Sequence, residues 1–323
     1  MAQPTDSFKQ FDYSLRPSKQ VERKIMIEVL LRLAKAGCNV SEYGYLGFGS
    51  VYYVDFVMFH KYLFIEKMTC VEWGDVEKRM RFNKPYKFIK LKLGALSKHI
   101  PGISSLEKLF VWLDYDRALD LEMLQDLQGM SSRLAPGSLL VVTTDARPKL
   151  PKDEFELEGM SSEERESLTQ QTYSEWFSQY TASAIPEDMA SRFHVAPLFY
   201  EVILERIRQT LNRRGEGLRL IQLFNYFYRD GAPMFTVGGM IGTDRHEQEL
   251  RRAGVFDHRF VRHGPDYLEI SVPPLTVREK HWLDHRLDRK LTSAKLCFEL
   301  DEDLLQNYRK FYKEYPTYME TLL

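Results

Sequence analysis

Glycines at one point of the sequence suggest a site for an anionic ligand. They lie in Tyr45-Leu46-Gly47-Phe48-Gly49-Ser50, after an apolar run and before a helical pattern. Glycine lets a backbone approach a ligand closely, and unpaired N–H groups at a helix start can bind a carboxylate or phosphate. With Gly44 the spacing is G-x-x-G-x-G, which is neither the dinucleotide fingerprint nor a triphosphate loop. The alternative is a tight turn that needs glycine only for packing.

An acid follows the glycines at an informative interval. Glu72 lies 23 residues after Gly49, in the segment Thr69-Cys70-Val71-Glu72-Trp73. A carboxylate at the end of the second strand of a βαβ unit commonly accepts hydrogen bonds from ribose hydroxyls. Trp73 could then lie against an adenine ring. A surface glutamate beside a core tryptophan is the alternative, but glycines and acid together favour a nucleotide cofactor.

Three aspartates follow two further apolar runs. Asp114 and Asp116 end Trp112-Leu113-Asp114-Tyr115-Asp116, and Asp145 ends Thr143-Thr144-Asp145. Ligands bind at the carboxyl ends of strands in open α/β sheets, so Asp114 is a candidate general base, metal ligand or contact to a cofactor amine. Asp114 and Asp145 together could hold Mg²⁺ if their strands are neighbours. Capping of the next helix or turn is the alternative for Asp116 and Asp145.

The elements that would position these residues alternate between short apolar runs and amphipathic stretches. A helix is expected over residues 18–36, with Ser18 as its cap and Gly37 at its end. Strands are expected at residues 43–46, 68–73, 88–93, 109–113 and 138–144, and further helices at 51–63 and 119–134. Strands that alternate with helices predict an α/β fold with a doubly wound, mostly parallel sheet.

The second half of the chain departs from this alternation. We expect residues 146–217 to form a helical insertion or cap, with an amphipathic helix over 197–213. Asp230-Gly231 between apolar runs at 218–228 and 233–241 predicts an antiparallel hairpin. A last strand (267–272) and helices at about 275–295 and 301–315 would follow. The chain then reads as one domain made of an arm (1–17), a cofactor-binding half (18–145), the insertion (146–217) and the hairpin with C-terminal helices (218–323).

Composition narrows the class of protein. The 323 residues are 44% hydrophobic, with 45 Lys and Arg against 46 Asp and Glu. A net charge of −1 gives no global basic field to hold nucleic acid. Three widely spaced cysteines, Cys38, Cys70 and Cys297, indicate a reducing compartment and no thiolate metal site. With no signal-peptide pattern and no apolar run of about 20 residues, a cytoplasmic protein without a membrane partner is expected.

The glycine loop, the acid after the second strand, the aspartate after the fourth and the terminal hairpin resemble the class I S-adenosylmethionine-dependent methyltransferases. More narrowly, the sequence resembles a bacterial O-methyltransferase family of largely undocumented function. The resemblance is carried by residues 16–24 (RPSKQVERK), 45–56 (YLGFGSVYYVDF), 81–85 (RFNKP) and 112–116 (WLDYD). It covers about residues 14–150 well and the rest poorly.

The resemblance implies a Rossmann-like fold, S-adenosylmethionine as cofactor, and methyl transfer to the oxygen of a small-molecule or macromolecular acceptor that the sequence does not identify. It places the candidate residues around the donor: Gly47, Gly49 and Ser50 at the methionine end, Glu72 at the ribose, Trp73 beside adenine, and Asp114 near the methyl group. Asp114 and Asp116 are the candidate catalytic residues. The N-terminal helix, with Arg16, Lys19 and Arg23, would close over the site.

Two positions depart from the family patterns. Metal-dependent O-methyltransferases carry Asp-Asn after the fifth strand, and here Ala146 takes the place of the asparagine, so the metal set Asp114 and Asp145 lacks a member. The usual acid of the first strand is also absent. Its nearest equivalents are Tyr43 and Tyr45, and Tyr53 or Asp55 of the next helix could substitute.

These departures keep two alternatives open. The first is a binding module that holds S-adenosylmethionine or another nucleotide without turnover, with a second copy or a partner protein on its C-terminal helices. The second is an RNA or DNA methyltransferase that uses the arginine-rich segments 205–219 and 245–262, with affinity that falls steeply with salt. The missing (Asp/Asn)-Pro-Pro-(Tyr/Phe) motif argues against methylation of base amines, and the interleaved acids of both segments favour a solvated surface.

Overall fold

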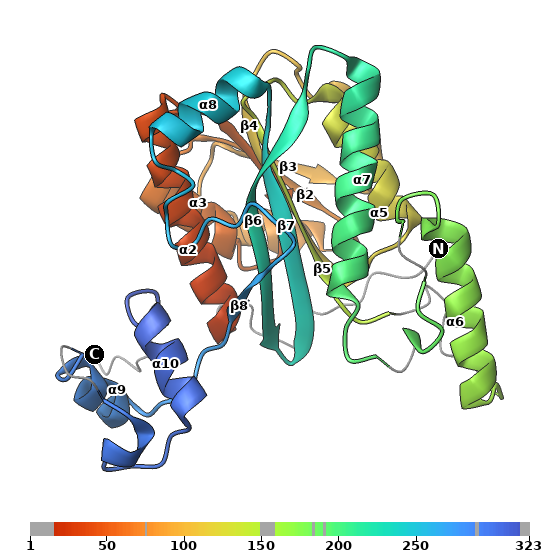
Figure 1. Ribbon diagram of the computed structural model, residues 1–323. Helices are drawn as coiled ribbons and strands as arrows, with labels where there is room; N and C mark the ends of the chain where they lie inside the picture. Colours follow the sequence, from red (N-terminus) through yellow and green to blue (C-terminus); the bar gives the residue numbers. More distant parts are fainter. Residues whose placement is uncertain are drawn as a thin grey trace.

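A single mixed sheet forms the centre of the molecule. The computed structural model describes residues 16–74, 76–148, 159–182, 185–189, 192–287 and 291–316, so the predicted arm lies outside them up to residue 15. Within these ranges the strands form one eight-stranded sheet of order β3-β2-β1-β4-β5-β7-β6-β8 (Figure 1). The predicted doubly wound α/β architecture is confirmed.

Five strands in the first half of the chain run parallel. They are β1 (Gly44–Phe48), β2 (Lys67–Glu72), β3 (Ile89–Leu93), β4 (Leu109–Ala118) and β5 (Leu139–Asp145). The central register aligns Gly47 of β1 with Cys70 of β2 and with Trp112 of β4. Strand β5 is buried throughout, as expected for a strand covered by helices on both faces. The parallel arrangement brings the carboxyl ends of β1, β2, β4 and β5 to one edge of the sheet, here called the carboxyl edge.

Strand β4 is longer than predicted. The apolar run ends at Leu113, but pairing with β5 continues, after an irregularity, to Ala118. Asp114 and Asp116 therefore lie within the strand. The suggestion that Asp116 caps the next helix is wrong, because Asp120 is the cap and accepts a hydrogen bond of 2.9 Å from Met123 N–H. The alternation of apolar and polar residues that predicts a strand cannot show that strand pairing continues through charged residues.

A long hairpin completes the sheet. Strands β6 (Arg219–Asp230) and β7 (Ala232–Gly242) pair antiparallel, as predicted, and Gly231 turns between them with a φ of 92°. A left-handed backbone at that position suits glycine. The short strand β8 (Leu268–Ile270) adds parallel to β6. Since β7 is antiparallel to β5, the tip of the hairpin lies at the carboxyl edge.

Helices cover both faces (Figure 1). On one side lie α2 (Pro17–Leu33) and α3 (Val54–Leu63), and on the other α5 (Leu121–Arg133) and α7 (Ala196–Arg214), which confirms the helix expected over residues 197–213. Further helices are α4 (Glu77–Asn83), α6 (Ser162–Phe177) and α8 (Asp244–Arg252), of which α4 and α8 were not predicted. Two hydrophobic clusters, one on each side of the sheet, make up the main core.

The C-terminal helices form a smaller unit. Helices α9 (Val277–Asp284) and α10 (Glu302–Phe311) are shorter than predicted and share a core around Leu283 and Tyr308. Lys24 of α2 joins them to the sheet domain through hydrogen bonds to the carbonyls of Glu314 and Tyr315. Among the described helices, none combines the length and the apolar character needed to cross a bilayer.

The start of α2 is held from a distance. Ser18 was expected to cap the helix, and this is wrong: the cap position is Arg16, which makes no side-chain cap bond. Instead the carboxylate of Asp230, at the hairpin tip, accepts hydrogen bonds from Ser18 N–H (3.0 Å) and Lys19 N–H (2.8 Å). A carboxylate at a helix N-terminus accepts hydrogen bonds from the unpaired N–H groups and is attracted by the positive end of the helix dipole. The predicted end at Gly37 is confirmed by its left-handed φ of 76° after the short 3-10 turn Ala34–Ala36.

Candidate functional site

The glycine loop after β1 packs tightly against β2. Gly49 N–H donates to the Val71 carbonyl at 3.2 Å. A Cβ on Gly49 would lie 2.3 Å from Cys70 Sγ and 3.0 Å from Met80 Cε, so no side chain fits there without rearrangement. The same position is 3.7 Å from Glu72 Oε2. Packing therefore requires glycine at residue 49, and it also brings the loop backbone beside the Glu72 carboxylate.

Gly47 leaves room for a tyrosine hydroxyl. A Cβ on Gly47 would lie 2.2 Å from Tyr45 Oη and 3.3 Å from the Trp112 carbonyl. Tyr45 is buried, and its pKa is raised, chiefly by burial and then by the charges of Asp55 and Asp114. The phenol thus stays neutral near the carboxyl edge. Tyr43 does not come to this edge, because its hydroxyl donates to the Gly137 carbonyl at 3.0 Å.

Glu72 carries an unsatisfied oxygen. Its Oε1 accepts a hydrogen bond from Trp73 N–H at 3.0 Å, whereas its Oε2 is buried and has no hydrogen-bond partner in the described part of the chain. Burial, with a smaller contribution from Asp116, raises the pKa of Glu72 to about 8. The neighbouring Trp73 side chain is 41% exposed. A buried acceptor beside an accessible ring fits the hydroxyls and the base of an adenosine.

Asp114 is held by a lysine from the first helix. Lys19 Nζ lies 2.6 Å from Asp114 Oδ1, 2.9 Å from Glu22 Oε2 and 4.2 Å from the centre of the Trp112 ring. Lys19 is 1% exposed, whereas the Asp114 side chain is 21% exposed. The ammonium is therefore enclosed by protein, and Asp114 is the partner that faces the solvent at the carboxyl edge.

A series of hydrogen bonds between buried side chains lies behind the Lys19–Asp114 pair. Trp112 Nε1 donates to Thr143 Oγ1 at 2.9 Å, Thr143 and Thr236 share a hydrogen bond of 2.7 Å, and the Thr236 hydroxyl donates to Glu22. Glu22 is fully buried, and burial raises its pKa despite the opposing charge of Lys19. This series links α2, β4, β5 and β7, so the placement of Asp114 depends on all four elements.

Helix α2 makes a second buried ion pair one turn later. Arg23 Nε donates to Asp55 Oδ1 at 2.5 Å, and Asp55 lies in the first turn of α3, directly after the glycine loop. Lys19 and Arg23 were expected to close over the site. The structure places them in contact with the acids that flank it. Sequence reasoning missed the roles of Glu22 and Asp230; the signal for Glu22 was a run of charges at 19, 22 and 23 within the apolar stripe of a helix.

The other two aspartates lie apart from the Lys19–Asp114 pair. Asp116 is exposed, and its charge contributes to the raised pKa of Glu72. Asp145 is buried and binds Arg147, with 2.6 Å between Oδ2 and Nη2. Its register partner is Ala118, whereas Asp114 is opposite Thr143.

These positions do not fit a magnesium site. The Asp145 carboxylate already has a cationic partner, and no group of three or more His, Cys, Asp or Glu that could hold a metal ion occurs within the described ranges. The hypothesis of a metal ion on Asp114 and Asp145 therefore gains no support.

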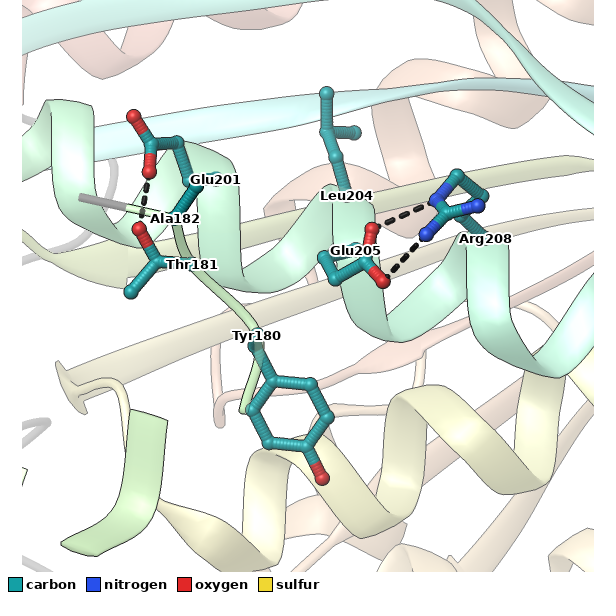
Figure 2. Close-up of a pocket in the computed structure, with 7 residues that line it drawn as sticks. All are labelled: Tyr180, Thr181, Ala182, Glu201, Leu204, Glu205 and Arg208. Atoms are coloured by element: carbon teal, nitrogen blue, oxygen red, sulfur yellow. Dashed lines mark hydrogen bonds and ion pairs between the residues drawn. The ribbon is translucent and has the colours of Figure 1, made fainter. Parts of the chain in front are cut away.

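A surface pocket lies elsewhere on the molecule. It has a volume of about 340 Å³ and is formed by one side of α7 and by residues 180–182 (Figure 2). Its acids are engaged: Glu205 pairs with Arg208 at 2.7 Å, and Glu201 accepts a hydrogen bond from Thr181. None of the residues predicted to bind the donor or to take part in catalysis lines it.

Comparisons with known proteins give one family match and solved structures of low similarity. No curated protein sequence matches the chain. Among solved structures, the chain is similar to Trm1 from Pyrococcus horikoshii with S-adenosyl-L-methionine (11% identity, 74% of this chain, 59% of that chain, TM-score 0.45). It is also similar to the N-methyltransferase NodS from Bradyrhizobium japonicum with S-adenosyl-L-homocysteine (13% identity, 74% of this chain, 94% of that chain, TM-score 0.34).

The family comparison extends over nearly the whole sequence. The model of one methyltransferase family matches residues 11–323, well beyond the region in which the resemblance was evident from motifs. The match includes the glycine loop, Glu72, Asp114 and the hairpin. The chain belongs to the family described as "Putative O-methyltransferase", and it is a methyltransferase of the Rossmann-like class.

Proposed function

We propose that the carboxyl edge binds S-adenosylmethionine with its adenosine on Glu72 and Trp73. The observation that carries this proposal is the buried Oε2 of Glu72, which lacks a partner among the described residues and lies beside the backbone of Gly49. A buried acceptor without a donor is costly to a protein, and a ribose hydroxyl would satisfy it. The exposed Trp73 ring offers a face for the adenine.

The remaining glycine-loop residues would lie along the methionine end of the donor. Gly47, Gly49 and Ser50 present backbone at the end of β1, where a side chain at 47 or 49 would collide with its neighbours. The donor supplies an activated methyl group, so the protein's task is to hold an acceptor in line with it and to arrange charge around both.

Asp114 is the proposed general base. Lys19 holds Oδ1, which leaves the second carboxylate oxygen for a ligand at the carboxyl edge. The proton of an acceptor hydroxyl would pass to this oxygen while the acceptor oxygen forms its bond to the methyl carbon and the bond from carbon to sulfur breaks. Asp116, exposed two residues further on, is the second candidate for this role.

The test separates binding from turnover. Wild type and Asp114→Asn are incubated with methyl-tritiated S-adenosylmethionine and a cell extract, and donor affinity is measured in parallel by calorimetry. We expect label transfer by the wild type, a loss of 100-fold or more in Asp114→Asn, and a donor affinity that changes less than tenfold. Binding by the wild type without label transfer would favour the binding module, and equal transfer by both proteins would remove Asp114 from catalysis.

A further inference from the structure

One stretch of the chain is strongly basic although the whole chain is neutral. Residues 76–98 contain a single acid, Glu77, against eight lysines and arginines: Lys78, Arg79, Arg81, Lys84, Lys87, Lys90, Lys92 and Lys98. The total of 45 basic and 46 acidic residues conceals this asymmetry. A net charge near zero excludes a global basic field, but a local surface can still attract a polyanion.

These residues lie together at one side of the sheet. Seven of them belong to α4, to the turn that follows it, and to β3, which is the edge strand, and Lys98 lies in a short 3-10 turn after β3. We call the exposed members on α4, the following turn and β3 the basic edge: Lys78, Arg79, Arg81, Lys87, Lys90 and Lys92. Lys84 is excluded, because it is half-buried and donates to the carbonyls of Lys87 and Ile89.

The charges of the basic edge are compensated less than those of other basic surfaces. On α8 two of the three arginines have an acid on the same helix: Arg245 pairs with Glu249 at 2.9 Å, and Arg251 with Glu247 at 2.6 Å. At the basic edge Arg81 pairs with Glu77 at 2.6 Å. No ion pair joins Lys78, Lys87, Lys90 or Lys92 to an acid in the ranges that the structure describes. A positive potential therefore remains at this surface.

Aromatic side chains accompany these cations. Phe82 of α4 is 90% exposed and follows Arg81 directly, and Trp73 precedes the helix. Lysines on an edge strand discourage edge-to-edge pairing, which would account for Lys90 and Lys92. It does not account for the cations of α4 or for a fully accessible phenylalanine among them. Cations interleaved with accessible rings are typical of surfaces that bind single-stranded nucleic acids, where phosphates meet the cations and bases stack on the rings.

We propose that the basic edge binds a single-stranded nucleic acid, with phosphates along its cations and a base stacked on Phe82. Strands β3 and β4 are three strand spacings apart in the sheet, a distance of about 14 Å. A nucleic acid bound at the basic edge would therefore reach the carboxyl edge within a few nucleotides. The proposal does not require the donor assignment, because the surface can bind nucleic acid whether or not S-adenosylmethionine binds at Glu72.

The test uses fluorescence anisotropy with labelled 20-nucleotide oligo(U) and oligo(dT). We expect binding at 50 mM salt that weakens with a log–log slope of about −3. Lys78→Gln/Lys87→Gln/Lys90→Gln should weaken it tenfold or more and reduce the slope by about 2. Arg245→Gln/Arg251→Gln/Arg252→Gln removes the same charge from α8 and should change affinity less than twofold. Tighter binding of oligo(U) than of oligo(dT) would identify RNA as the preferred ligand. Equal binding would show that the surface recognises phosphates and bases and that the 2′-hydroxyl plays no role.

Phe82→Ala distinguishes a nucleic-acid site from a general polyanion site. We expect it to weaken oligonucleotide binding fivefold or more and to leave binding to heparin, which has no bases, unchanged. The proposal fails if neither oligonucleotide binds at 50 mM salt, or if both triple variants lose affinity equally. It also fails if Phe82→Ala weakens heparin as much as oligo(U), or if phosphatidylserine vesicles bind more tightly than either oligonucleotide.

Discussion

Lys19 Nζ lies 2.6 Å from Asp114 Oδ1, and this contact joins helix α2 to strand β4. The lysine is enclosed by Glu22 and by the rings of Trp112 and Tyr228, so its charge acts on the carboxyl edge through Asp114. Asp230 fixes the helix start from which Lys19 extends. The candidate active site therefore depends on elements from both ends of the sequence: helix α2 near the N-terminus and the β6–β7 hairpin in the C-terminal half.

Replacement of Lys19 by methionine should destabilise the protein. It leaves Glu22 buried without its cation, and loss of one partner of a buried pair costs about 3 kcal/mol. Urea unfolding followed by circular dichroism would measure the loss. Lys35→Met, on the exposed turn after the same helix, should have no effect beyond about 0.5 kcal/mol. A similar small effect for Lys19→Met would show that the ion pair does not hold α2 in place.

Glu72 should make stability fall as the pH rises. Its pKa is about 8 in the folded protein against an ordinary value of 4.5, so between these values the folded state binds more protons than the unfolded state. Glu72→Gln removes this dependence and should therefore be the more stable protein, by an amount that grows from pH 5 to pH 8 and is constant above. Melting temperatures of both proteins at pH 5, 7 and 9 test this. A constant difference across the range would contradict it.

The same group should make donor binding depend on pH. Ribose hydroxyls donate to an ionised carboxylate, so affinity for S-adenosylmethionine should rise up to tenfold per pH unit below about 8 and level off above. Calorimetry at pH 6, 7 and 9 measures the trend, and Glu72→Gln should bind weakly at all three. An affinity that is independent of pH in the wild type would place the ribose elsewhere.

Gly49→Ala should disrupt the loop after β1. The added methyl would lie 2.3 Å from Cys70 Sγ, an overlap that costs about 1–3 kcal/mol. Because the conflict is with that sulfur, Gly49→Ala/Cys70→Ala should recover part of the lost stability. Thermal unfolding of the two variants measures the recovery. A double variant that is less stable than Gly49→Ala would show that the added methyl does not collide with the Cys70 sulfur.

Asp230→Ala should weaken the docking of α2. It removes the acceptor of Ser18 N–H and Lys19 N–H, a loss of about 1–2 kcal/mol for a helix cap. Asp230→Asn keeps an oxygen acceptor and should cost less. Chemical denaturation of both variants, with exposed Asp266→Ala as the control, measures the difference. Equal losses for Ala and Asn would mean that Asp230 acts through its charge alone.

Much of the fold was predictable because it depends on short-range pattern. Apolar runs located all five parallel strands, and Asp230-Gly231 located the hairpin. The extension of β4 to Ala118 was missed because its last residues are charged and are held in the strand by neighbouring β5. Helix α8 was missed because its sequence, DRHEQELRR, carries almost no apolar stripe and is stabilised by pairs such as Arg245–Glu249.

The site was predictable in part, and for a related reason. Spacing along the chain pointed to Gly49 and Glu72, which lie beside each other where the adjacent strands β1 and β2 end. The cap of α2 was not predictable, because Ser18 and Asp230 are 212 residues apart and only the folded sheet brings them together. For the same reason, the environment of Lys19 could not be read from its neighbours in the sequence.

The most direct test of the central claim is calorimetric titration of S-adenosylmethionine into the wild type, Glu72→Ala and Glu66→Ala at pH 8.5. Glu66 is an exposed acid just before β2 and serves as the matched control. The account predicts wild-type binding, a loss of tenfold or more in Glu72→Ala, which corresponds to about 1.5–3 kcal/mol, and no change in Glu66→Ala. Wild-type binding that Glu72→Ala leaves unchanged, or no binding at all, would contradict a donor site at the end of β2.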